Sequence, residues 1–363
     1  MDILVMISQV LLYVCFSILA GSFLLQLIPS TYRPDVKIPT NYLLISAIMV
    51  PIFAFVPVLD TTLFIAPRLG FGEAIKTVLL SYTVGNAWNF TVIGSVLLVL
   101  VIALMRSNEK RTSAFIALGL TFGLMLSVAW SSHAGVMEPL MGITGHFIHL
   151  AAISVWVGVV LVVGWFATNH HHWLTFLSWF SKVAIGCLVA TALSGILLMD
   201  ILVDGYANSW MVSYGQGLLI KHLFLIPLVF YAFLNGIVVK NLLSKDASFN
   251  PIPWIRLEGI ILFVIFTMTA FFTQQSPPHG NSLTNDDVSP LFRLFHGGII
   301  DSSSTIGFTI NIEIVYFFLL SILFLGLIIW SIYKKASIII TFLLSCLLVV
   351  NIYIMLMISV VVR

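Results

Sequence analysis

The segment at residues 131–150, SSHAGVMEPLMGITGHFIHL, gathers side chains that can bind metal ions. His146 and His149 are spaced i, i+3, so a helix would carry both imidazoles on one face. Met137 and Met141 are spaced i, i+4 and would offer thioether sulfurs in the same way. Imidazole is the commonest metal ligand, and together with thioether sulfur it suits copper better than magnesium, calcium or manganese. The segment therefore predicts a copper site, for Cu(I) or Cu(II).

The composition of the chain shows what must hold this segment in place. Hydrophobic residues make up 60% of the 363 residues, charged residues make up 8%, and the mean hydropathy is +1.11. Soluble domains contain about 25% charged residues, so the chain is expected to be a polytopic membrane protein that contacts lipid. The net charge of +2 and the lack of a basic stripe give no sign of nucleic-acid binding. The three cysteines stand alone in apolar runs, without a CxxC pair, and are interpreted as packing residues.

The hydropathy pattern predicts an all-α bundle of about ten transmembrane helices, with a range of eight to ten. Each helix needs about 20 apolar residues to cross the hydrocarbon. The windows are 4–28, 42–60, 87–106, 112–131, 145–168, 176–203, 215–240, 255–274, 311–333 and 337–360. The amphipathic segment 61–86, which follows the proline-containing second window, is expected to be an interfacial helix.

The distribution of lysine and arginine orients these helices. Basic residues collect in the loops after the odd-numbered spans, and acidic residues collect in the opposite loops. The basic set is Arg33, Lys37, Arg106, Lys110, Arg111, Lys182, Lys240, Lys245, Arg256, Lys334 and Lys335. Because short cytoplasmic loops are rich in lysine and arginine, both termini are predicted to be extracytoplasmic.

This topology brings several histidines to the outer face. His133, His146 and His149 fall at the outer ends of the fourth and fifth spans, and His279 falls just beyond the eighth. The candidate ligands are His133, His146, His149, His279, Met137 and Met141. His222, about two turns into the seventh span, is a second-tier candidate, and a hydrogen bond between helices is its alternative role. The two methionines could instead be packing residues.

Other polar residues have simpler interpretations. His170, His171 and His172 are expected in a cytoplasmic loop, and His296 is expected to be solvated in the long outer loop. Arg256 and Glu258 open the eighth span, where they either pair or anchor the helix end.

Several blocks, in order, resemble the CopD family of bacterial copper-resistance and copper-transport membrane proteins. They cover about residues 130–280 and comprise SSHAG, GHFIHLAAISVWVGVVL, FSKVAIGCLVATALSGILL, YGQGLLIKHLFLIPLVFYAFLN, RLEG and PPHG. The resemblance implies an integral membrane protein that handles copper, with His133, His146 and His149 at the family's histidine positions and His279 in PPHG. It also implies a CopC-like extracytoplasmic copper-binding partner, expected here to be a separate protein because the chain carries no fused domain of that kind.

The expected organisation has four parts. Residues 1–120 are expected to form N-terminal membrane helices, and residues 121–280 are expected to form a CopD-like copper-handling core. Residues 281–310 are expected to be an outer loop, followed by a C-terminal helix pair in residues 311–363. The expected function is copper binding at the extracytoplasmic face with copper import across the membrane, without enzymatic activity. The sequence contains no nucleotide-binding motif, so it gives no indication of an ATP-driven pump.

Two alternatives remain open. The protein could deliver copper to another extracytoplasmic protein, or act in assembly, without transport. It could also bind haem between histidines of facing helices and transfer electrons. The oligomeric state is not predicted.

Overall fold

The computed structural model describes residues 2–105, 110–203, 205–246, 249–273, 275, 283–334 and 336–363. Its helices are α1 (Asp2–Leu27), α2 (Thr40–Leu69), α3 (Phe71–Ser81), α4 (Thr83–Ala103), α5 (Lys110–Trp130), α6 (His133–Met137), α7 (Pro139–Phe166), α8 (Trp173–Leu202), α9 (Ser213–Leu234), α10 (Lys240–Lys245), α11 (Ile252–Phe272), α12 (Pro290–Arg293), α13 (Ile312–Tyr333) and α14 (Ile338–Ser359). Within the described residues, ten helical segments are long and apolar enough to cross a membrane, which confirms the predicted all-α polytopic fold.

The chain divides into two compact units. Unit 1 contains Met1–Ile201 and Val238–Gly259, and unit 2 contains Leu202–Ile237 and Ile260–Arg363. Short 3₁₀ turns connect some of the helices, and a π-helical turn, Asn235–Val239, continues α9 into α10.

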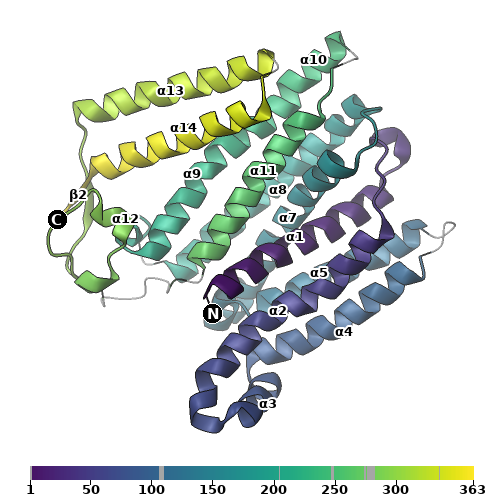
Figure 1. Cartoon of the computed structure of the whole chain (residues 1–363), viewed down its shortest axis with the longest axis horizontal. Helices are drawn as coiled ribbons and strands as arrows, with labels where there is room; N and C mark the ends of the chain where they lie inside the picture. The colour runs from purple at the N-terminus through teal and green to yellow at the C-terminus, as the bar shows by residue number, and fades with distance from the viewer. Residues whose placement is uncertain are drawn as a thin grey trace. The chain divides into compact units, whose positions relative to one another are not determined.

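In unit 1, α1 lies along α7 (Figure 1). The two backbones approach closely where Gly21 meets Gly158. A Cβ atom on Gly21 would lie 2.1 Å from the carbonyl carbon of Gly158, so only hydrogen fits at this crossing. Small residues commonly permit such close helix packing in membranes, where van der Waals contact replaces the hydrophobic driving force. This crossing therefore anchors α7, the helix that carries His146 and His149.

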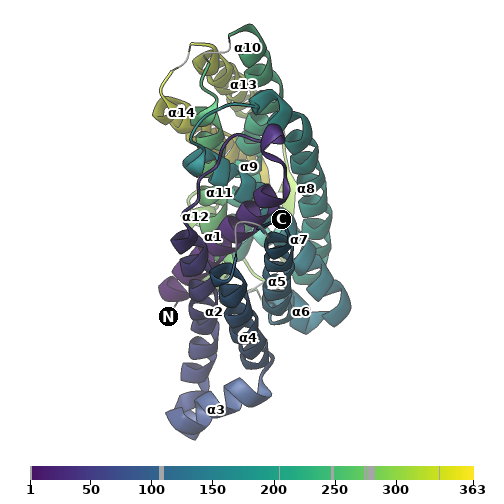
Figure 2. The same ribbon diagram turned by 90° about the vertical axis from the view of Figure 1, so that its right-hand side faces the viewer.

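The second span is longer than the sequence pattern suggested, because α2 begins at Thr40 and continues beyond residue 60, through Pro67, to Leu69. It ends at Gly70, whose φ of 76° reverses the chain direction. The segment expected to be an interfacial helix is thus shared between the end of α2, the separate helix α3 and the start of α4. Figures 1 and 2 show α3 at the far ends of α2 and α4.

In unit 2, α13 and α14 form an antiparallel pair (Figure 1). Polar side chains join these helices inside the apolar surroundings: Asn351 Nδ2 donates to Ser321 Oγ at 2.7 Å. The hydroxyl groups of Tyr231 in α9 and Ser345 in α14 lie 2.7 Å apart. Beyond α12, strand β1 (Ile306–Phe308) pairs antiparallel with β2 (Val360–Val362), a small sheet added to the otherwise helical fold.

Candidate functional site: the α6–α7 histidine segment

The histidine-rich segment folds as a short helix turned back onto a long one. Ser132 caps α6, because its Oγ accepts a hydrogen bond from the Gly135 N–H at 3.1 Å. Pro139 occupies the first turn of α7, where its missing N–H costs nothing. A Cβ atom on Gly142 would lie 1.9 Å from the Ala134 carbonyl oxygen, so α6 rests directly on the start of α7. The local sequence therefore brings α6 and the start of α7 together.

The ring of His149 is held against α8. Its Nδ1 lies 3.1 Å from Ser194 Oγ, and that hydroxyl donates its own proton to the Ala190 carbonyl oxygen at 2.6 Å. Ser194 Oγ therefore accepts a hydrogen bond from the Nδ1–H group, which favours the tautomer with its lone pair on Nε2, one of the two ring nitrogens through which neutral histidine binds metals. Gly195 borders the ring, since a Cβ there would make ordinary van der Waals contact with Cε1 at 3.4 Å. His146, half-buried like His149, lies one turn nearer the start of α7.

The remaining predicted ligands of unit 1 lie at the surface of the protein. His133 is exposed on α6, and the side chains of Met137 and Met141 are 45% and 58% exposed. No group of three or more histidine, cysteine, aspartate or glutamate side chains able to hold a metal ion occurs in the described part of the chain. The structure thus brings α6 against α7 without assembling the whole ligand set, which stays a prediction. His279 lies outside the described residues.

His222 belongs to unit 2, where its Nδ1 lies 2.7 Å from Tyr206 Oη. Burial raises the pKa of Tyr206 to about 12, so the phenol keeps its proton and can donate it. The considered alternative was a hydrogen bond between helices, whereas here His222 of α9 contacts a residue of the connection that precedes α9.

His296 is half-buried rather than free in solvent, which corrects the expectation for the outer loop. Its ring centroid lies 4.4 Å from that of Phe292, and its Nε2 is buried without a hydrogen-bond partner. Burial lowers the pKa of His296, and a hydrogen bond to the Met357 main chain opposes this in part. The ring packs because α12 places Phe292 one turn before it.

The run of His170, His171 and His172 lies in the connection from α7 to α8, at the opposite end of α7 from His146. His172 adopts a left-handed backbone conformation with φ of 57°. The seventeen residues from His149 to the end of α7 span about 25 Å at 1.5 Å per helical residue. These histidines therefore cannot contribute to a site at His149.

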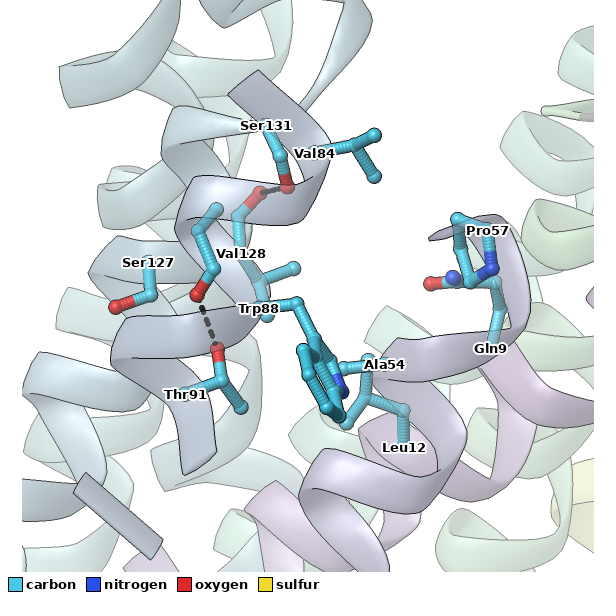
Figure 3. Close-up of a pocket in the computed structure, with 11 residues that line it drawn as sticks. Gln9, Leu12, Ala54, Pro57, Val84, Trp88, Thr91, Ser127, Val128 and Ser131 are labelled. Atoms are coloured by element: carbon cyan, nitrogen blue, oxygen red, sulfur yellow. Dashed lines mark hydrogen bonds between the residues drawn. The ribbon is translucent and has the colours of Figure 1, made fainter. Parts of the chain in front are cut away.

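A small cavity of about 40 Å³ lies in unit 1 among α1, α2, α4 and α5 (Figure 3). Trp88 projects along it, and its indole N–H donates to the Pro51 carbonyl oxygen at 2.8 Å. The polar groups that line the cavity belong to Gln9, Thr91, Ser127 and Ser131, together with the indole of Trp88. Such a space holds on the order of three water molecules, and its amide and hydroxyl oxygens are hard ligands that do not favour copper.

Glu258 is a buried carboxylate that the sequence interpretation placed at a helix end. It lies six residues inside α11 and is 4% exposed, and its Oε1 accepts a hydrogen bond from Trp156 Nε1 at 3.0 Å. Arg256 Nε donates to the Gly164 carbonyl oxygen at 2.6 Å, which draws that side chain to the end of α7. The sequence could have indicated this difference, because Arg256 and Glu258 are two residues apart and such residues do not face the same side of a helix.

The fold and the polar groups within it define a multi-pass membrane protein. Comparisons with known proteins identify the family that it resembles. The family described as copper resistance protein D matches residues 174–272, and the family described as the N-terminal domain of copper resistance protein D-like proteins matches residues 1–143. The chain belongs to the copper resistance protein D family and is a multi-pass protein of the plasma membrane.

Two curated relatives are similar over more than half of the chain. The copper transport protein CutJ of Bacillus subtilis is 28% identical over 226 residues, which is 58% of this chain and 41% of the relative. The inner membrane protein YebZ of Escherichia coli is 25% identical over 215 residues, 55% of this chain and 72% of the relative. The chain thus spans less than half of the length of CutJ. No solved structure matches it.

Proposed function

We propose that this protein binds copper at the His146–His149 end of α7 and carries it across the membrane. The observation that carries the proposal is the 3.1 Å contact between His149 Nδ1 and Ser194 Oγ, which holds this imidazole against α8 as hydrogen-bond partners hold the ring of a metal-binding histidine. The family membership and the name of CutJ as a copper transport protein support copper as the ion.

The remaining ligands are recruited when the ion binds. His146 lies one turn from His149 on the same face of α7, and α6 rests on the first turns of that helix. His133, Met137 and Met141 are exposed and free of tight packing, so small rotations can bring imidazole or thioether groups to the ion. A site completed by mobile side chains releases its ion more readily than a rigid four-ligand site, which suits transport.

The distribution of charge supports an outward-facing entry site and, with it, import. The positive-inside rule places the connection between α7 and α8 in the cytoplasm, so the His146 end of α7 faces outward. Copper arriving there, from solution or from a separate CopC-like protein, would move inward. The protein itself performs no chemical conversion in this scheme.

Copper uptake into proteoliposomes tests the proposal. Vesicles containing the full-length protein, given Cu(I) outside in the presence of a reductant, are expected to accumulate copper faster than protein-free vesicles, as measured by elemental analysis. High-affinity binding without accumulation would favour copper delivery to another protein. A Soret absorption band in the purified protein would identify the haem alternative, and absence of copper binding would refute the function.

A further inference from the structure

A pocket at the surface of unit 1 lies where the last residue of α1 meets the first turns of α5. It has a volume of about 390 Å³, is open to the surroundings and is lined by Leu27, Arg111, Thr112 and Phe115. The two helices pack against each other, and Leu27 rests on the buried cluster to which Ala114 of α5 belongs. The pocket is therefore built by the packed ends of two helices, and its volume is in the range of small-molecule sites.

The lining of this pocket is polar towards the helix end and apolar further along. Arg111 and Thr112 precede Phe115 by four and three residues, so the three side chains share one side of α5. All three are exposed, and Phe115 leaves 70% of its surface uncovered. A guanidinium and a hydroxyl thus lie about one helical turn, or about 5 Å, from an aromatic ring, and Leu27 adds aliphatic surface from α1.

The charge of Arg111 is not neutralised inside the protein. Within the described residues Arg111 forms no ion pair, and Thr112 Oγ1 makes no hydrogen bond. The sequence RSNEKR at residues 106–111 contains three basic residues and one acidic residue, so this end of α5 carries net positive charge. The polar half of the pocket is therefore suited to an anion.

The pocket lies at the depth of the lipid headgroups. The 26 residues of α1 and the 21 residues of α5 extend about 39 Å and about 32 Å, whereas the hydrocarbon core is about 30 Å thick. The end of α1 and the start of α5 therefore reach the polar surface of the bilayer. The distribution of lysine and arginine predicts the cytoplasmic leaflet, where basic pockets between membrane helices bind anionic headgroups.

We propose that this pocket binds one anionic phospholipid, with its phosphate at Arg111 and Thr112 and an acyl chain along Phe115 and Leu27. The planar guanidinium can donate two parallel hydrogen bonds to phosphate oxygens, and the threonine hydroxyl adds a third donor. The exposed ring of Phe115 continues the pocket towards the hydrocarbon. A polar end followed by an apolar end matches a lipid better than a free anion, and the inference is independent of the proposed copper function.

Native mass spectrometry of the full-length protein in detergent tests the site, with phosphatidylglycerol as the probe. Arg111→Gln is expected to raise the dissociation constant of the first bound phosphatidylglycerol by at least about tenfold, because it removes hydrogen bonds to a charged group. Lys182→Gln, which neutralises an exposed basic side chain on the face predicted to be cytoplasmic, is the matched control and should keep wild-type affinity. Equal affinities for the two variants would overturn the proposal.

A second measurement needs no substitution. A photoactivatable phosphatidylglycerol is expected to cross-link the wild-type protein at the Leu27 end of α1 or in the first turns of α5, and excess inorganic phosphate should not prevent this. Cross-links confined to other helices would overturn the proposal. Complete competition by inorganic phosphate would also overturn it, because the pocket would then be a site for a free anion.

Discussion

The His149 imidazole is joined to α8 through Ser194, with Nδ1 and Oγ 3.1 Å apart and the serine proton directed to Ala190. This hydrogen bond favours the tautomer of His149 that is protonated at Nδ1. Outer hydrogen-bond partners of this kind change metal affinity by about 10- to 100-fold at known sites. In the proposed copper site, the contact would link the packing of two membrane helices to the chemistry of one ligand.

Ser194→Ala is expected to lower copper affinity by about tenfold without unfolding the protein, because it removes the acceptor that fixes the His149 tautomer. Competition with a chromophoric Cu(I) chelator measures the affinity. Ser178→Ala, which changes an exposed hydroxyl on the same helix, is the control. Equal affinities for the two variants would mean that Ser194 does not position the ligand.

Gly158→Ala is expected to destabilise the protein by about 2 kcal/mol or more, because the added Cβ would lie 2.2 Å from the Ser17 carbonyl oxygen of α1. Thermal unfolding in detergent measures the change. Gly186→Ala is the control, since a Cβ there meets no atom within 4 Å. A Gly158→Ala protein as stable as this control would argue against the close crossing of α1 and α7.

Tyr206→Phe tests whether His222 is structural. Loss of the 2.7 Å contact with His222 Nδ1 is expected to cost about 1 kcal/mol of stability and to leave copper affinity unchanged. Chemical denaturation and copper titration of the same preparation check both statements. A large loss of copper affinity would instead place His222 at a metal site.

The lowered pKa of His296 predicts a dependence of stability on pH. The group's folded pKa lies below the value of 6.5 for an unperturbed histidine, so its contribution is fully present above pH 6.5 and is lost as the pH falls through the folded pKa. His296→Gln should therefore show a shallower loss of thermal stability than wild type between about pH 7 and pH 5. Parallel stability curves for the two proteins would contradict this assignment.

Much of the fold follows from the sequence because the bilayer imposes length and composition on each span. The spans of α7 and α8 could be predicted from runs of apolar residues alone. Ser132 marks the start of α6 and Pro139 marks the start of α7. The extension of α2 beyond residue 60 to Leu69 was missed, because neighbouring helices can compensate the hydrogen bonds that a proline such as Pro67 removes from a membrane helix.

The site was less predictable, because its contacts join residues far apart in the chain. The i, i+3 spacing identified His146 and His149 as a pair, but nothing in the local sequence indicated Ser194 as the partner of His149. Glu258 and Cys187 were taken for an end anchor and a packing residue. Only the three-dimensional packing shows that Glu258 is buried and accepts the indole N–H of Trp156.

The most direct test of the central claim is a Cu(I) titration of two variants of the purified protein. Changing His146 and His149 together to alanine is expected to abolish high-affinity copper binding, whereas changing His170, His171 and His172 to alanine should leave it intact, because those side chains lie at the other end of α7. Equal, wild-type affinity in both variants would contradict the account.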